Sequence, residues 1–459
     1  MNRFGVNVEL KHVPVLDPDF IPLMRFNRAF LEGAKKPVGI AVERSDGQMA
    51  SLHTFIHGAP EWKEADCYYI ERLVKTILWM KGGFRVYVSG DEGICEYLRS
   101  LYCAGGRQEF DWDFMSNVFE HPFEVVLTDE LPESKDLPKA IGGHLGGCRI
   151  GFDAGGSDRK VSAVIDGETV YSEEVVWFPK TNSDPDYHYN GIVAALKSAA
   201  EHLPRVDAVG VSSAGIFINN RTMRASLFLK VPKELYDEKV KDIYIRAIRD
   251  TFGEVPYCVI NDGDVSALAG ALSLNDASVL GIAMGTSEAV GYVDEAGRIT
   301  GWLNELAFVP VDANPDAMRD EWSGDVGCGV KYFSQDSVIK LAPRAGIELD
   351  DSASPAEKLK AVQKLMAQDD PRAAQVYESI GVYLGHTLAC YYELYGCRHV
   401  LLLGRVMSGK GGDLILETAR EVLADEYPEL EGKMLPELPD EKFRRVGQSM
   451  AAASLPEAD

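Results

Sequence analysis

The spacing of apolar and polar positions changes along the chain between a period of two and a helical period, which predicts alternating strands and helices. A stretch at 38–56 is split by Ser45-Asp46-Gly47, which is typical of two strands joined by a turn. The elements predicted next are a helix at 68–81, a strand at 84–88 and a helix at 92–102. These elements predict a small α/β domain, and the polar stretch 128–139 is expected to be its exit linker.

From residue 148 the pattern starts again and then repeats in outline. Three strands are predicted at 148–153, 160–165 and 169–178, and helices and strands then alternate up to 257–260. A strand at 279–284, a glycine turn and a strand at 289–293 follow. Because strand, glycine-rich turn and strand occur on both sides of Asp262, the pattern indicates two lobes built on one plan, with a cleft between them.

The predicted fold class is therefore α/β, with two lobes and an additional small N-terminal domain. At 459 residues the chain exceeds the ~250 to 300 residues of a single core, so two or three domains are expected. The predicted boundaries are 1–145 for an N-terminal domain of unknown role, 146–264 for a small lobe joined by a C-terminal helix within 441–455, and 265–440 for a large lobe. The first of these lacks a phosphate-binding glycine pair, which favours a structural or dimerisation role.

Charge and composition restrict the class of partner. A formal net charge of -24 disfavours a broad grip on nucleic acid or an anionic membrane, because both require a basic patch. The N-terminus has no secretory signal pattern and no apolar run reaches ~20 residues, so we expect a cytoplasmic protein that does not cross a membrane. The eight cysteines form no Cys-x-x-Cys pair, which favours reduced thiols.

Two segments carry the most specific chemistry. In the first, Asp153 precedes Gly155-Gly156, and glycine allows backbone N–H groups to approach phosphate oxygens closely. In the second, Asp262 offers a carboxylate that can take the proton of a hydroxyl nucleophile. Together they indicate ATP-dependent phosphoryl transfer. Two structural alternatives stay open, namely a glycine-rich hairpin turn for the first segment and helix capping by Asn261 and Asp262 for the second.

The order of motifs over residues 147–455 resembles the ROK family of bacterial sugar kinases and repressors, within the actin-like (ribonuclease-H-like) ATPase superfamily. Five segments carry the resemblance: 151–160, Asn261-Asp262, Gly285-Thr286-Ser287, 378–385 and 400–404. It implies two actin-like lobes and a sugar kinase that uses ATP and Mg²⁺. A homodimer is one arrangement that it implies.

The resemblance also implies a role for individual residues. Asp153 holds hydrated Mg²⁺ through water, Asp262 is the catalytic base, and Asn261 and Glu305 bind the substrate. The residues implied to bind the nucleotide and its phosphates are Gly155, Gly156, Ser157, Gly285, Thr286, Ser287 and Gly404.

The family's zinc motif is largely absent. Its register falls on residues 321–328, where only the last thiol, Cys328, is present, and the family's metal-binding histidine position is Phe308. One thiolate cannot hold a four-coordinate zinc, so we predict no structural zinc. We expect the loop to be held by packing of Trp322 and Phe308 instead.

The expected substrate and phosphate contacts also differ from the family pattern. Val330 and Leu227 replace a Glu and an Asn, which removes polar contacts worth ~1 to 3 kcal/mol each. Asp158 replaces a lysine of the first loop, and Arg159 or Lys160 are candidates to compensate. Asp264, where the family has Asn, is expected either to raise the pKa of Asp262 or to face solvent.

These observations lead to three hypotheses. The first is an ATP- and Mg²⁺-dependent kinase for a sugar or sugar-like polyol. The second is a non-catalytic sugar or nucleotide sensor, which the changed contacts favour. The third is an activator-type ATPase of the same superfamily, which would need cysteines for an iron–sulfur cluster. In each case the partners are small molecules, without nucleic acid or membrane.

Overall fold

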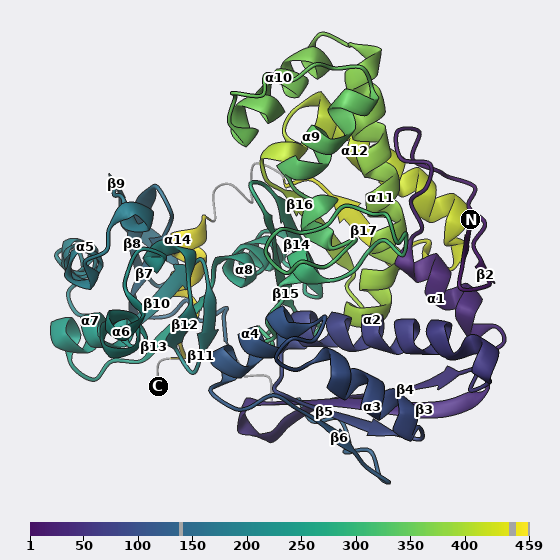
Figure 1. Ribbon diagram of the computed structural model, residues 1–459. Helices are drawn as coiled ribbons and strands as arrows, with labels where there is room; N and C mark the ends of the chain where they lie inside the picture. The colour runs from purple at the N-terminus through teal and green to yellow at the C-terminus, as the bar shows by residue number, and fades with distance from the viewer. Residues whose placement is uncertain (137–140, 440–446, 458–459) are drawn as a thin grey trace. The chain divides into compact units, whose positions relative to one another are not determined.

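The computed structural model describes residues 1–136, 141–439 and 447–457 (Figure 1). The chain divides into two compact units. Unit 1 contains Met1–Leu137, Ile282–Val290 and Trp302–Leu438, and unit 2 contains Pro138–Gly281, Gly291–Gly301 and Pro439–Asp459. The predicted three-part division stays a prediction. The observed grouping differs from it, because the N-terminal segment packs with residues of the expected large lobe.

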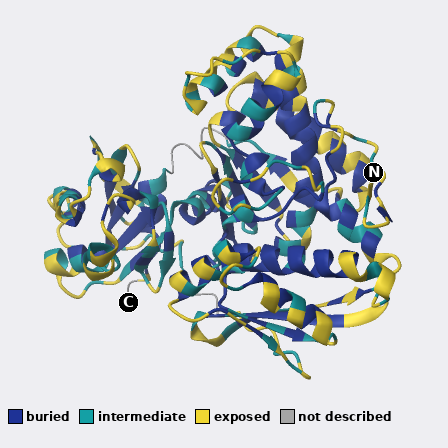
Figure 2. Ribbon diagram, in the orientation of Figure 1, coloured by how far each residue is buried: buried dark blue, intermediate teal, exposed yellow. Residues whose placement is uncertain are grey.

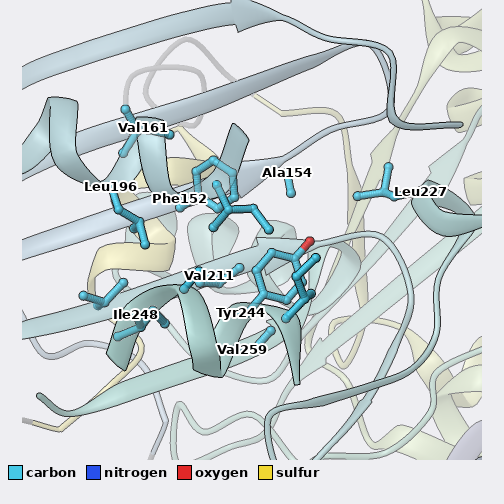
Figure 3. Close-up of a cluster of buried hydrophobic side chains, with 14 of the residues drawn as sticks. Phe152, Ala154, Val161, Leu196, Val211, Leu227, Tyr244, Ile248 and Val259 are labelled. Atoms are coloured by element: carbon cyan, nitrogen blue, oxygen red, sulfur yellow. The ribbon is translucent and has the colours of Figure 1, made fainter. Parts of the chain in front are cut away.

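Unit 2 is built on a five-stranded sheet with the order β13-β10-β7-β8-β9. Its strands are β7 (Cys148–Ala154), β8 (Asp158–Ile165), β9 (Glu168–Val176), β10 (Ala208–Ser213) and β13 (Tyr257–Asn261). β7, β10 and β13 are parallel, whereas β7, β8 and β9 form the antiparallel meander that the sequence predicts. The helices α5 (Pro185–Ala200) and α7 (Ile243–Phe252) share a core with this sheet, in which Phe152, Val211 and Tyr244 are fully buried (Figure 3).

The short helix α14 (Gln448–Ala453) lies directly against β7 and β10. A Cβ atom on Gly151 would lie 1.6 Å from Ser449 O, and one on Gly210 would lie 1.7 Å from Ala452 O. Only glycine at these two positions allows the helix backbone to come this close to the strands. The expected C-terminal helix thus joins unit 2, while its predicted positions 441–446 lie outside the described residues.

The N-terminal segment of unit 1 forms a four-stranded sheet with the order β4-β3-β5-β6. Its strands are β3 (Lys36–Arg44), β4 (Gln48–Ile56), β5 (Arg85–Ser89) and β6 (Glu124–Leu127), and its helices are α1 (Leu23–Leu31), α2 (Lys63–Lys81), α3 (Glu92–Leu101) and α4 (Glu109–Phe119). Figure 2 shows α2 buried along most of its length. It is buried because it contacts both this sheet and the turn η6 (Leu306–Phe308).

The rest of unit 1 contains a helical layer and strands of a sheet with the order β15-β14-β16-β17. These strands are β14 (Val279–Met284), β15 (Glu288–Val293), β16 (His399–Leu403) and β17 (Leu435–Glu437), and the helices are α9 (Gln335–Arg344), α10 (Pro355–Ala367), α11 (Pro371–Tyr395) and α12 (Lys410–Glu426). α11 and α12 pack at glycine positions, since a Cβ on Gly385 would lie 2.5 Å from Val422 Cβ. The helix of the 378–385 motif is therefore a packing element.

Two features of the helices differ from the sequence prediction. In the alternating part of the pattern, the sequence predicts one continuous helix over 233–251, but the structure divides it into α6 (Lys233–Leu235), the π-helical turn η5 (Tyr236–Val240) and α7. Thr222 N donates to Lys241 O at 2.8 Å, which takes that carbonyl out of the helical pattern. The helices α1, α4, α9 and α10 were not predicted. Across the described parts of the chain, no helix combines the length and apolar character that a membrane span requires.

Candidate functional site

The carboxyl ends of three parallel strands bring the predicted metal residue and the predicted base to one edge of the sheet in unit 2. β10 pairs with β7 on one side and β13 on the other, so that Ser212 lies opposite both Asp153 and Ile260. Asp262 follows β13 directly, as the first residue of α8 (Asp262–Leu274). Ligands of parallel α/β sheets bind at this kind of edge.

Asp153 is buried, and its Oδ1 accepts a hydrogen bond from Ser212 Oγ at 2.9 Å. Burial, opposed by this hydrogen bond and assisted by the negative charge of Asp262, raises the pKa of Asp153 to about 6. Asp262 is thus close enough to Asp153 to act on it electrostatically. Within the described residues the structure records a hydrogen bond to Oδ1 only. Oδ2 can therefore accept from a water molecule of a hydrated metal ion.

Asp262 is half-buried at the start of α8. Burial raises the pKa of its carboxyl group, while backbone hydrogen bonds from Gly263 and from Asp262 itself and the positive charge of Lys180 lower it, with a net rise. A carboxylate with a raised pKa is a stronger general base than an exposed one. The electrostatics of this edge therefore favour proton abstraction by Asp262.

Asn261 caps the helix α8, which is the structural alternative to substrate binding. Its Oδ1 accepts from Gly263 N at 2.7 Å, which makes Asn261 the N-cap of α8, and its Nδ2 donates to Gly215 O at 2.7 Å. Because both polar ends already have partners, its predicted substrate contact stays a prediction. Asp264 is buried and accepts from Tyr292 N at 3.0 Å, so the expectation that it could face solvent is wrong.

The first glycine turn, Gly155-Gly156-Ser157, joins β7 to β8. A Cβ on Gly155 would lie 2.6 Å from Asp158 O, so this position requires glycine. Trp177 fixes the turn from the end of β9, because its Nε1 donates to Gly155 O at 2.7 Å and its backbone N donates to Ser157 O at 3.1 Å. The segment is thus a hairpin turn, as the structural alternative states, and it is also an ordered loop beside Asp153.

Neither basic residue expected to compensate for Asp158 is free of other contacts. Lys160 Nζ lies 3.8 Å from a carboxylate oxygen of Glu174 and 3.9 Å from one of Asp158. The Arg159 guanidinium lies 5.8 Å from the centre of the Trp177 ring. A third basic residue, Lys180, lies beside Gly156, and nothing in the pattern around this single lysine indicates it in the sequence.

The second glycine turn, Gly285-Thr286-Ser287, lies in unit 1 between β14 and β15. Gly285 N donates to Ser287 O at 3.0 Å, and Gly285 O accepts from the first residue of α9, Gln335 N, at 2.9 Å. Arg405 Nη2 donates to Thr286 Oγ1 at 2.6 Å. The side chain of Arg405, which directly follows the predicted nucleotide residue Gly404, therefore reaches the predicted phosphate turn.

Gly404 precedes this arginine and is confined to glycine by its surroundings. Its φ is +92°, and a Cβ would lie 2.4 Å from Met284 O. Residues shortly after Gly404 help to line a cavity of 280 Å³. This volume is close to the lower end of the ~300 to 1,000 Å³ that is typical of small-molecule pockets. The residues that line it are Gln363, Met366, Ala367, Tyr377, Ser408, Gly409, Lys410 and Gly411.

The predicted substrate residue Glu305 is held by the N-terminal segment. Glu305 N donates to Trp79 O at 3.0 Å, and Asn304 N donates to Met80 O at 2.9 Å. These carbonyls belong to the last turn of α2, where helix carbonyls lack intrahelical partners. The Phe308 ring also packs on Trp79, with 4.3 Å between the ring centres. The helix α2 therefore positions the segment around Glu305.

Glu288, at the start of β15, is a buried carboxylate that the sequence analysis did not single out. It is only 4% exposed, and neither of its oxygens has a hydrogen-bond partner within the described residues. The pKa of Glu288 is raised to about 8. Burial is the largest cause, the Tyr391 hydroxyl opposes it, and the negative charge of Glu305 adds to it. A Cβ on Gly329 would lie 2.4 Å from Glu288 Oε2, which places this carboxyl against the residue before Val330.

The loop in the position of the family's zinc motif is held by buried charges from α2. Asp325 Oδ2 lies 2.9 Å from Arg72 Nη1 and 3.3 Å from Lys75 Nζ, and Lys75 also pairs with Asp111 at 2.7 Å. Burial would raise the pKa of Asp325, but the charges of Arg72 and Lys75 outweigh it and hold that pKa below its ordinary range. The expectation that Trp322 packs to hold this loop is wrong, because Trp322 is 63% exposed.

The oxygen, nitrogen and sulfur atoms available in the structure indicate which metal ion this chain could hold. Mg²⁺ binds through one or two carboxylates and keeps several waters, which fits Asp153 with its available Oδ2. In the described part of the chain, no three or more His, Cys, Asp or Glu side chains gather where they could hold a metal ion. The expected absence of zinc stays a prediction.

The α/β sheets and the two glycine turns fit an actin-like fold. The ROK family profile matches residues 149–426, and the chain belongs to the ROK family. This confirms the predicted family and the predicted α/β fold of two actin-like lobes with an additional N-terminal segment. No curated protein matches the sequence.

Several solved structures are similar to this chain. A ROK hexokinase from Thermus thermophilus has a TM-score of 0.52 and 19% identity, over 67% of this chain and 96% of that one. A ROK family transcriptional regulator, a homolog of the E. coli MLC protein, has a TM-score of 0.53 and 17% identity, over 68% and 79%. A ROK family glucokinase from Streptomyces griseus, in complex with glucose and AMPPNP, has a TM-score of 0.46 and 19% identity, over 67% and 98%. At these identities the likeness shows the fold alone.

Proposed function

We propose that this protein is an ATP- and Mg²⁺-dependent kinase that phosphorylates a hydroxyl group of a sugar or sugar-like polyol. The observation that carries the proposal is the pairing of Asp153 and Asp262 at one sheet edge, beside a glycine turn that lies within the same unit. A single acidic residue at a turn would carry no such proposal. Two carboxylates at one sheet edge beside a glycine turn, with Asp262 acting electrostatically on Asp153, fit metal binding by Asp153 and proton abstraction by Asp262.

The residues divide the reaction between them. Asp262 accepts the hydroxyl proton while the substrate oxygen bonds to the γ-phosphorus and the bond from that phosphorus to the bridging oxygen breaks, which releases ADP. Asp153 orients water molecules of Mg²⁺, and that ion, when bound, neutralises charge on the phosphate oxygens. The two glycine turns bind phosphate groups through backbone N–H groups and through the hydroxyls of Ser157, Thr286 and Ser287.

The remaining predicted residues bind the organic parts of the substrates. Glu305, and Asn261 if it leaves its capping partners, accept hydrogen bonds from substrate hydroxyls. The cavity beside Ser408 and Tyr377 receives the nucleotide base, with Gly404 as the close-approach position.

The experiment is an assay of ADP release with a panel of monosaccharides and polyols, with Mg²⁺ and ATP, on the full chain. We expect turnover with at least one member, and a fall of at least about 10²-fold with Asp262→Asn. A chain that binds AMP-PNP or a sugar but turns over none of them would contradict the kinase proposal.

That outcome would favour the second candidate, a non-catalytic sugar or nucleotide sensor. The specific observation behind it is the replacement of expected polar contacts by Leu227, which is fully buried in the core of unit 2 (Figure 3), and by Val330. A thermal-shift screen of the same panel would detect such binding without turnover, because a ligand stabilises the native state by mass action.

A further inference from the structure

Lys180 is a basic side chain that lies over the first glycine turn. It is the middle residue of the short turn η3 (Pro179–Thr181), which follows β9. Its Cε and Nζ atoms lie 2.7 Å and 2.9 Å from the position that a Cβ on Gly156 would take. The absence of a side chain on Gly156 therefore leaves the space that the lysine amine occupies.

The backbone around Lys180 is fixed to the same turn and to the core. Immediately before it, Trp177 donates two hydrogen bonds to the carbonyls of Gly155 and Ser157, at 2.7 Å and 3.1 Å. Pro179 O lies 3.0 Å from Nε2 of His188, which is fully buried. The base of the lysine side chain is thus anchored, while its side chain reaches an exposed position over the glycines.

The amine of Lys180 differs from that of Lys160 in its charged neighbours. Among the residues that the structure describes, no carboxylate forms a salt bridge with it, whereas Lys160 lies near two. Its positive charge lowers the pKa of Asp262, so the amine is near the predicted base as well as the turn. An unpaired cation between a glycine turn and a carboxylate edge matches the place where negative charge develops in phosphoryl transfer.

We propose that Lys180 is a catalytic residue that binds the phosphate tail of the nucleoside triphosphate over the first glycine turn, in the role that Asp158 cannot serve. This inference rests on the proposed function. The ammonium group donates charge-assisted hydrogen bonds to phosphate oxygens and also favours the ionised form of Asp262. It deepens the kinase proposal by naming the cation of the first turn.

The test compares Lys180→Met, Lys180→Arg, Lys160→Met and Lys197→Met in the full chain. Lys197 is an exposed lysine of α5 in the same unit and serves as the matched control. The readouts are the affinity for Mg²⁺ and AMP-PNP by calorimetry, kcat and KM for ATP, and the pH profile of kcat. Thermal unfolding of each variant checks that it is folded.

We expect Lys180→Met to weaken AMP-PNP binding at least about tenfold and to lower kcat by about 10²-fold, with partial recovery in Lys180→Arg. Its acid limb of kcat moves to higher pH, because the charge that lowers the pKa of Asp262 is lost. A merely structural role would not move that limb. Lys197→Met is expected to match the wild type.

Folded Lys180→Met with wild-type affinity and kcat would overturn the inference and leave the kinase proposal standing. So would loss of binding in Lys160→Met alone, since Lys160 would then be the phosphate cation. If the wild type binds AMP-PNP but transfers no phosphate, the kinase proposal fails and the affinities still decide the role of Lys180. If the wild type binds no AMP-PNP, both are overturned.

Discussion

The two glycine turns differ in how each is accompanied by a basic side chain. At the first turn, Lys180 lies over Gly156 without an ion pair among the described residues, and Trp177 of the same unit donates two hydrogen bonds to the turn. At the second turn, Arg405 already donates to the Thr286 hydroxyl. A free cation is available to a ligand, whereas an engaged one mainly orders the loop. We therefore expect the first turn to carry more of the catalysis.

The first glycine turn with its carboxylates (the first region) and the segment around Glu305 (the second region) are also held in place by different contacts. The carboxylates near the first turn are held by strands of their own sheet. The segment around Glu305 is held by α2 of the N-terminal segment, through backbone hydrogen bonds and the buried pairs of Asp325. The N-terminal segment is thus part of the predicted substrate region, which gives its structural role a physical basis.

The largest expected effect comes from removing the base at the first region. Asp262→Asn keeps the size of the side chain but cannot accept the proton, so kcat is expected to fall by about 10²- to 10⁴-fold. Steady-state kinetics measure it, with Asp250→Asn in α7 as the control. Activity above a tenth of the wild type would show that Asp262 is not the base. It would also contradict the expectation that the first turn carries more of the catalysis than the second.

The next effect concerns the support of the second region. Asp325→Asn removes the buried carboxylate that Arg72 and Lys75 share and leaves each cation with one other buried partner, Glu71 and Asp111 respectively. Because breaking a buried pair costs about 3 to 5 kcal/mol when no partner remains, we expect a loss of about 2 to 4 kcal/mol of unfolding free energy. Urea denaturation measures it, with the exposed Asp351→Asn as the control. Loss of stability below about 1 kcal/mol would mean that packing, and not this ion cluster, holds the loop.

Gly404 and Gly396 form a matched pair in unit 1. Both have positive φ, but a Cβ meets Met284 O at 2.4 Å only at Gly404, and at Gly396, which ends α11, it meets nothing within 4 Å. Gly404→Ala is expected to destabilise by about 1 to 3 kcal/mol and to weaken AMP-PNP binding, whereas Gly396→Ala costs about 1 kcal/mol and leaves the affinity unchanged. Equal losses of stability and affinity in the two variants would contradict a special role for Gly404.

Arg405→Ala sharpens the comparison of the two basic side chains. Loss of its hydrogen bond to Thr286 is expected to raise the KM for ATP about five- to tenfold, since a hydrogen bond to a charged group contributes about 1.5 kcal/mol. The acid limb of the kcat profile should stay in place, in contrast to Lys180→Met. A shift of that limb in Arg405→Ala would show that the second turn also acts on the base.

The last prediction concerns the pH dependence of stability. The native pKa of Glu288 is raised to about 8, so between its ordinary value of 4.5 and pH 8 the native state holds a proton that the unfolded state releases, and stability falls as pH rises. Glu288→Gln removes this loss. Its Tm should match the wild type near pH 5 and exceed it by a few degrees near pH 8. An equal difference at both pH values would contradict the raised pKa.

The sequence predicted the elements that repeat and the residues that lie in motifs. The parallel strands placed Asp153 and Asp262 at one edge because strand ends meet there whatever the side chains between them. Lys180, Arg405 and Glu288 were not predictable, because each acts on a turn or loop far from it in the sequence. The packing expected of Trp322 was wrong, since buried charges of α2 hold that loop.

The glycine contact between α14 and the strands of unit 2 has a consequence for synthesis. Gln448 Nε2 donates to Asp262 O at 2.9 Å across 186 positions of the chain. At about 5 to 20 residues per second, a ribosome needs roughly 10 to 40 s to make that intervening stretch. The strands that carry Gly151 and Gly210 therefore lack their covering helix for at least that time, and the edge bearing both carboxylates is completed only after α14 has been made.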